Sequence, residues 1–166
     1  MEMLEELEKF LKGAKKVIVC GIGNDTRGDD ALGVLIAENL KKKVRNPKVT
    51  ILNCGEMPES YAGRIIREMP SHVMFIDAVH FNGKPGDLIF ADPEGTLGET
   101  YSTHKLPLKL LVGYLKQNLR AKFILIGIQP KQIGLFQEMS PEVRKSMEVL
   151  EEALSLLLSS IGVENP

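Results

Sequence analysis

Cysteine is scarce in this chain, and its scarcity excludes several kinds of fold and site. Only Cys20 and Cys54 are present, and they form no Cys-x-x-Cys pair. Two cysteines are too few for a disulfide framework, and their spacing fits neither a structural zinc site nor a redox motif. We therefore expect reduced thiols and a cytoplasmic location.

An excess of charge of one sign is also lacking, as are long apolar runs. Lysine and arginine together number 21 and aspartate and glutamate 22, which gives a formal net charge of -1. The bulk charge therefore favours neither nucleic acid nor an anionic membrane surface as a partner. No apolar run reaches the roughly 20 residues that a membrane span needs, and residues 1–16 lack the positive start of a signal peptide. We expect no nucleic-acid partner and no membrane insertion, so partner choice depends on a local site.

The order of apolar segments indicates the fold class. Runs rich in β-branched residues alternate with segments of helical periodicity, which is typical of a parallel sheet covered by helices on both faces. We predict an α/β fold, a three-layer αβα sandwich with a twisted, mostly parallel sheet of five or six strands. We expect the 166 residues to form a single domain and a monomer.

The expected strands cover residues 17–20, 49–54, 73–76, 88–91 and 123–128, the last continued by 133–136. Residues 88–91 follow a Gly- and Pro-containing turn, which favours an antiparallel strand. The expected helices cover residues 2–12, 30–43, 59–68, 105–119 and 141–158. Residues 1–13 add an amphipathic helix at the N-terminus.

A Gly-rich segment, Gly21 to Gly33, follows the first expected strand. In such a sheet, ligands bind beyond the carboxyl ends of the strands. A dinucleotide fingerprint would need a third glycine where Thr26 stands, so a nucleotide-binding module is only a weaker alternative. Asp29 and Asp30 open the next helix, and one of them can cap its free amide groups. A cap leaves the second carboxylate unexplained, so Asp30 is either structural or part of a site.

Two further residues follow strand ends in the same way. Asp77 closes a buried strand, where it either caps the strand or serves as a ligand, because an unpaired buried charge is costly. His104 precedes a helix; His80 is the one rival ligand, and His72 is expected to be structural. Asp30, Asp77 and His104 would together form an open site for a divalent ion. No Gly-x-Ser-x-Gly motif supplies a competing nucleophile.

Six motifs occur in order between Lys16 and Leu158. They are GIGN, GDDALG, Met-Pro-Glu-Ser at 57–60, Phe-Ile-Asp-Ala at 75–78, Thr-His-Lys-Leu-Pro-Leu at 103–108 and Gly-Ile-Gln-Pro at 127–130. In these motifs the chain resembles the hydrogenase maturation proteases. Within that family it is most similar to the branch that serves formate-hydrogenlyase-type, energy-converting nickel-iron hydrogenases.

The resemblance implies an endopeptidase, of a family often classed as aspartic-type, that acts on the precursor of a nickel-iron hydrogenase large subunit. It would remove the C-terminal extension after nickel insertion. The family's metal-contacting positions correspond to Asp30, Asp77 and His104, with Asp30 and Asp77 as the catalytic acids. Nickel would be supplied by the precursor, so no tightly bound cofactor is expected, although other divalent ions can occupy the site.

The resemblance leaves several details open. Asn24, Asp29, Glu59 and Gln129 are candidates for the substrate cleft. Three of them also have a structural explanation: Asp29 as a helix cap, Glu59 as an acid at a helix start and Gln129 as an amide beside a turn. Without an activated serine or cysteine, water is the expected nucleophile. An aspartic dyad would need its carboxylates about 3 Å apart. A nickel-site checkpoint or metallochaperone that does not cleave the precursor is the alternative function.

Overall fold

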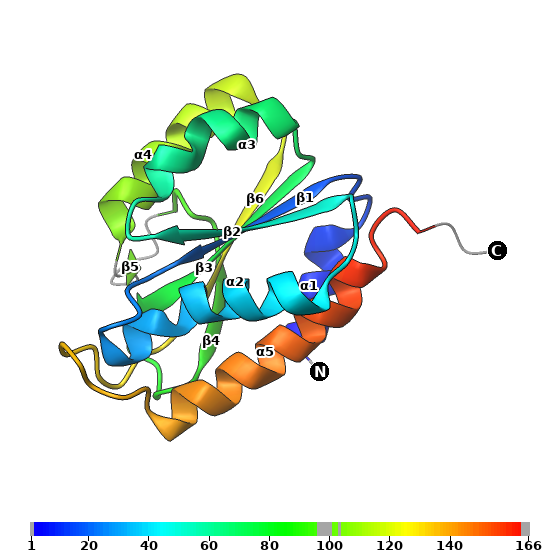
Figure 1. Ribbon diagram of the computed structural model, residues 1–166. Helices are drawn as coiled ribbons and strands as arrows, with labels where there is room; N and C mark the ends of the chain where they lie inside the picture. The colour runs from blue at the N-terminus through cyan, green and yellow to red at the C-terminus, as the bar shows by residue number, and fades with distance from the viewer. Residues whose placement is uncertain (1, 96–100, 103, 164–166) are drawn as a thin grey trace.

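A twisted sheet with helices on both faces organises the chain (Figure 1). The computed structural model describes residues 2–95, 101–102 and 104–163. The strands follow the order β2-β1-β3-β6-β4, and β5 pairs with β3 off this path. Their bounds are β1 Val17–Ile22, β2 Val49–Gly55, β3 His72–His80, β4 Leu88–Ala91, β5 Tyr101–Ser102 and β6 Lys122–Ile128. The strands β2, β1, β3 and β6 are parallel, whereas β4 and β5 are antiparallel to their neighbours.

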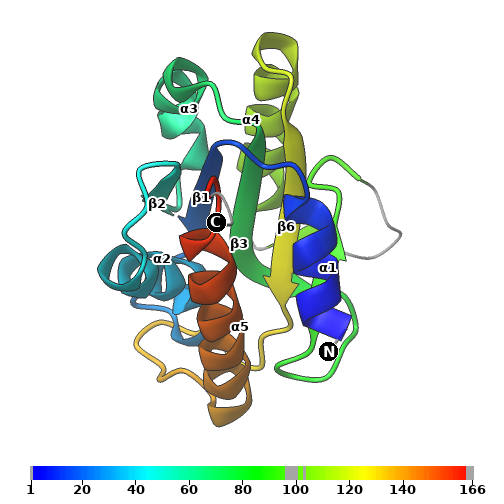
Figure 2. The same cartoon turned by 90° about the vertical axis from the view of Figure 1, so that its right-hand side faces the viewer.

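Two apolar cores lie on opposite faces of the sheet, and Figures 1 and 2 show the helices that cover these faces. On β1, Val17 and Val19 face one core while Ile18 and Cys20 face the other, because successive side chains of a strand alternate between faces. The helices on the first face are α1 Glu2–Leu11, α2 Leu32–Lys43 and α5 Pro141–Ser159. The helices on the second face are α3 Ala62–Glu68 and α4 Lys105–Asn118. The predicted three-layer fold is confirmed.

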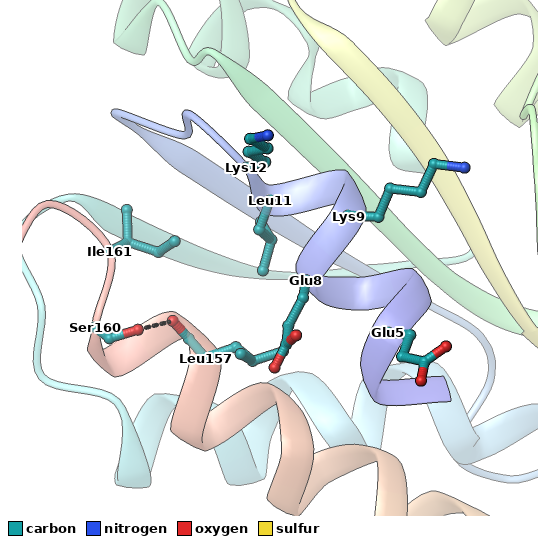
Figure 3. A pocket seen from close by; sticks show the side chains of 8 residues that line it. All are labelled: Glu5, Glu8, Lys9, Leu11, Lys12, Leu157, Ser160 and Ile161. Carbon is teal, nitrogen blue, oxygen red and sulfur yellow. Dashed lines mark hydrogen bonds between the residues drawn. The ribbon is translucent and has the colours of Figure 1, made fainter. Parts of the chain in front are cut away.

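The N-terminal helix α1 covers part of the first face. Its Leu7 is fully buried, and the Phe10 ring meets the His72 ring edge-on, with centroids 5.2 Å apart. This contact confirms the structural role expected for His72. Figure 3 shows the groove of about 460 Å³ between α1 and the end of α5. Its lining residues are Glu5, Glu8, Lys9, Leu11, Lys12, Leu157, Ser160 and Ile161.

The structure differs from the sequence prediction at four places. The helices expected from residues 30 and 59 begin instead with 3₁₀ turns, η1 Gly28–Ala31 and η2 Pro58–Tyr61. The strand expected at 133–136 is wrong, because Phe136 has a left-handed backbone with φ of 61° and its amide donates a hydrogen bond to Thr26. This conformation is incompatible with a strand. The short strand β5 was not predicted.

The glycines of the Gly-rich segment allow α2 to lie directly on the strand ends. A Cβ on Gly33 would overlap the carbonyl oxygens of Ile22 and Ile76, and a Cβ on Gly21 would overlap the carbonyl oxygen of Gly33. These positions therefore contact protein backbone, which is the close approach that only glycine permits. The glycines serve helix–strand packing, which accounts for them without a bound nucleotide.

Asp29 holds a distant loop in place. Its buried carboxylate accepts hydrogen bonds from the backbone N–H groups of Lys131 (2.8 Å), Gln132 (3.0 Å) and Ser140 (2.7 Å), and from the Ser140 hydroxyl. The residue before η1 is Arg27, and it makes no side-chain cap. Helix capping by Asp29 is therefore corrected to anchoring of the 131–140 loop, and its carboxylate is turned to that loop rather than to a cleft.

Replacing this acceptor should weaken the fold. We expect Asp29→Asn to lower the free energy of unfolding by about 2–4 kcal/mol, because an amide group would face backbone donors in a buried site. Urea denaturation measures the change. The control is Asp25→Asn, an exposed neighbour, which should shift stability by less than about 0.5 kcal/mol. Equal denaturation midpoints for the two variants would contradict the anchoring role.

Candidate active site at the carboxyl edge of the sheet

The structure brings Asp30, Asp77 and His104 together. Each offers one ligand atom, and the three atoms lie within 4.8 Å of one another. Asp30 lies on η1, which follows β1; Asp77 lies on β3; His104 precedes α4. Three segments far apart in the sequence therefore converge at one edge of the sheet. This juxtaposition agrees with the expectation from the sequence.

The position of Asp77 follows from the unequal lengths of neighbouring strands. The pairing of β1 with β3 ends at Gly21 and Ile76, one residue before Asp77. On its other side, Asp77 still pairs with Gly127 of β6. The end of β1 thus leaves space in which η1 approaches Asp77. By strand alternation, Asp77 points to the face that carries α4, whose first residue follows His104.

The two acids are more buried than the sequence suggested. Asp77 is fully buried and Asp30 is 4% exposed, so an open rim is found only at the imidazole of His104, which is 10% exposed. The Asp77 carboxylate accepts a 2.8 Å hydrogen bond from the amide of Ala78. The Nδ1 atom of His104 lies 3.4 Å from both carboxylate oxygens of Asp77. Buried carboxylates are costly unless positive charge lies nearby.

Glu56 is a residue of the site that sequence reasoning missed. Its Oε1 atom lies 3.4 Å from Nε2 of His104, and its side chain is 51% exposed. It directly follows β2, which ends at Gly55 on the same sheet edge. This position after a strand end could have identified Glu56 from the sequence, because Asp77 was chosen for its place at a strand end. The imidazole of His104 therefore lies between two carboxylates.

The surrounding acids change the titration of His104. Burial opposes its charged form, but the hydrogen bond and negative charge of Asp77, the charge of Asp30 and the contact with Glu56 outweigh burial. Together they raise the pKa of His104 to about 9. The ring is therefore protonated at neutral pH and supplies positive charge to the buried acids. A metal ion that binds the ring must displace this proton.

A cleft of about 310 Å³ adjoins the triad through Glu56. Asn24 lines it, and the Asn24 side-chain oxygen accepts hydrogen bonds from the amide (2.9 Å) and hydroxyl (2.6 Å) of Thr26. The cleft is lined by Gly23, Asn24, Asp25, Val34, Asn53, Gly55 and Glu56. Of the four residues predicted for a substrate cleft, Asn24 alone lines this one.

The remaining cleft candidates occupy other places. Glu59 is exposed in the first turn of η2, a position that suits an acid near a helix start. Gln129 is buried, and its side-chain oxygen accepts hydrogen bonds from the amides of Phe81 (2.9 Å) and Gly83 (3.2 Å). Its side-chain nitrogen donates to the carbonyl of Pro130. Gln129 therefore fixes the turn after β3.

The site has the donors of a divalent-metal site and lacks a protein nucleophile of the thiol type. Two carboxylates and one imidazole bind a divalent ion while leaving further coordination positions open. Cys20 and Cys54 are buried in the second core. A hydrogen bond with Cys54 and burial raise the pKa of Cys20 well above its ordinary value. Such a thiol is unreactive, so a hydrolytic reaction here would use water.

Metal binding should depend on pH through His104. Since its pKa is raised to about 9, the affinity for Ni²⁺ should rise about tenfold per pH unit between pH 7 and 8.5. Calorimetry in buffers of different ionisation enthalpy should detect about one proton released per ion at pH 7.5. His104→Ala should remove this proton release. An affinity that stays constant over the same range would contradict the protonated state of His104.

Comparisons with known proteins agree with this fold and show the family. A model of the hydrogenase maturation protease family matches residues 34–156, which include Asp77 and His104, whereas Asp30 precedes the match. A putative hydrogenase maturation protease of Methanocaldococcus jannaschii is 31% identical over 166 residues, covering 96% of this chain and 98% of the relative. The hydrogenase 3 maturation protease of Escherichia coli K12 is 29% identical, covering 83% of this chain and 87% of the relative.

A solved structure extends the likeness to three dimensions. The crystal structure of a NiFe hydrogenase maturation protease, HycI, from Thermococcus kodakarensis KOD1 superposes with a TM-score of 0.86. It is 50% identical in sequence, and the match covers 92% of this chain and 98% of that one. The chain belongs to the hydrogenase maturation protease family and is accordingly a peptidase.

Proposed function

We propose that this protein removes the C-terminal extension from the precursor of a nickel-iron hydrogenase large subunit after nickel has been inserted. The nickel in the precursor is the recognition signal. The observation that carries this proposal is the convergence of Asp30, Asp77 and His104 within 4.8 Å at a partly exposed edge. The hydrogenase maturation protease relatives support the general class of substrate.

The donor set suits an ion that the substrate brings. Three oxygen and nitrogen donors leave a lone ion incompletely coordinated, and His104 must first lose a proton. An ion already held by thiolates of the precursor would gain these donors as additional ligands. We infer that the protein has no tightly bound cofactor of its own and that other divalent ions can occupy the site. Cleavage then follows nickel loading.

The chemistry uses water as the nucleophile. Nickel held between the precursor and the triad positions the segment to be cut, and the carboxylates of Asp30 and Asp77 supply the general base. The carboxylate base takes a proton from water as the water oxygen attacks the scissile carbonyl carbon. The carboxyl group formed in this way then donates the same proton to the nitrogen of the departing extension, and the peptide bond breaks. Burial of the two acids excludes bulk water from these proton transfers.

One copy of the chain suffices for this reaction, because the three residues of the triad all come from one chain. We therefore infer a monomer. The two buried, free thiols support a reducing, cytoplasmic location. No helix in the described part of the chain is long and apolar enough to cross a membrane.

Nickel dependence tests the proposal directly. Purified protein is mixed with the nickel-loaded and the nickel-free large-subunit precursor of the host's own hydrogenase, and the products are weighed by mass spectrometry. We expect loss of the C-terminal extension from the loaded precursor alone, because only it completes the metal site. An unchanged mass together with a stable complex would instead support the checkpoint that binds without cleaving.

Substitutions in the triad should separate catalysis from folding. We expect Asp30→Asn, Asp77→Asn and His104→Ala to slow cleavage of the loaded precursor by about 10²-fold or more, since each removes an acid-base group or a metal ligand. Glu152→Gln, at an exposed position on α5, is the matched control and should change the rate by less than about threefold. Circular dichroism monitors the fold. If two of the triad variants unfold, the residues are structural, and if all three cleave normally, the proposed chemistry is wrong.

A further inference from the structure

A stripe of exposed apolar side chains on α4 begins two residues after His104. Leu106, Leu110 and Tyr114 are 67%, 64% and 52% exposed. A spacing of four residues places them on one face of the helix. The opposite face of α4 is buried in the second core and carries Leu108, Leu111, Val112 and Leu115.

Among the residues that the structure describes, no other element covers this stripe. A helix that covers a sheet normally turns polar residues to solvent, and α4 already fills its core with the other face. Gly113 lies near the stripe, and a Cβ there would meet nothing within 4 Å. A glycine inside a helix costs about 0.5–1 kcal/mol relative to alanine. The exposed apolar groups and the glycine therefore do not stabilise the helix itself. The missing side chain at Gly113 leaves a shallow depression beside the stripe.

A fourth exposed apolar residue is next in sequence to a residue of the active site. Met57 is 60% exposed and directly follows Glu56, whose carboxylate contacts His104. Met57 also precedes η2, which packs against α4. Figure 1 shows α3 and α4 as neighbouring helices on this face of the sheet. We call Met57, Leu106, Leu110 and Tyr114 together the α4 patch. Contiguous exposed apolar groups of this kind mark interaction sites.

We propose that the α4 patch is the surface on which the folded body of the hydrogenase large-subunit precursor docks. This inference rests on the proposed function. A partner that places its nickel at His104 must lie against the first turn of α4, because Leu106 is two residues away. From Leu106 to Tyr114 the stripe runs about 12 Å along the helix. A single extended segment entering the triad would touch only its beginning, so the whole stripe fits a broad, apolar surface of a folded partner.

The triad and the α4 patch have different roles in this arrangement. The triad binds the nickel and catalyses cleavage of the extension. The α4 patch supplies binding energy, because its apolar side chains are buried against the partner away from the reacting atoms. Apolar contacts that are equal in the bound substrate and the transition state lower KM and leave kcat unchanged. The patch therefore predicts a kinetic effect that differs from the effect of losing a triad residue.

The test uses charge on the patch and a matched control elsewhere. Leu106→Lys, Leu110→Lys and the double variant are compared with Leu156→Lys on α5, whose leucine is 70% exposed. Lysine and leucine have similar helix propensities, so the helices should persist. With the nickel-loaded precursor as substrate, the double variant should raise KM by about tenfold or more and change kcat by less than about twofold. Leu156→Lys should leave both constants unchanged.

Each outcome has a distinct meaning. If the wild type cleaves the precursor and the double variant retains the wild-type KM, the docking inference is overturned while the proposed function stands. If the wild type does not cleave, the proposed function fails and the docking inference fails with it. Light scattering tests whether the patch instead binds a second copy of the chain. If the wild type is a dimer and Leu106→Lys is a monomer, the patch is a dimer interface and the inference is overturned. Tyr114→Ser replaces any lysine variant that circular dichroism shows to be unfolded.

Discussion

Two neighbouring buried carboxylates are stable only when a positive charge compensates them. The chemistry of this molecule depends on that compensation. Asp30 and Asp77 lie at one sheet edge with little access to water, where unbalanced negative charge is unstable. In the free protein the charge comes from the protonated ring of His104, whose pKa is raised to about 9. In the proposed complex it comes from nickel, and the ring loses its proton to become a ligand. In this proposal, substrate binding exchanges the proton of His104 for the nickel ion of the precursor.

The rest of the fold holds these groups in place. Gly21 and Gly33 let α2 settle on the ends of β1 and β3, which brings η1 and Asp30 to Asp77. Asp29, next to Asp30, turns the other way and anchors the 131–140 loop through its buried carboxylate. Neighbouring aspartates therefore have separate tasks, one in stability and one in the site. This arrangement explains the two successive carboxylates of η1, Asp29 and Asp30.

The sequence predicted the layers, the central strands and the triad, because these depend on local patterns and on the rule that strand ends share an edge. It could not distinguish the tasks of Asp29 and Asp30, since that depends on contacts with residues about 100 positions away. Glu56 was missed because its role depends on the orientation of the His104 ring. The strand expected at 133–136 was wrong, because tertiary contacts and a left-handed Phe136 override the apolar pattern.

The central claim is that Asp30, Asp77 and His104 become ligands of nickel that the precursor already holds. X-ray absorption at the nickel edge tests it most directly. Spectra are recorded for the loaded precursor alone and for its rapidly frozen complex with this protein. The account predicts additional oxygen and nitrogen neighbours around nickel in the complex, with one nitrogen missing when the protein carries His104→Ala. Identical spectra for the free and the bound precursor would contradict it.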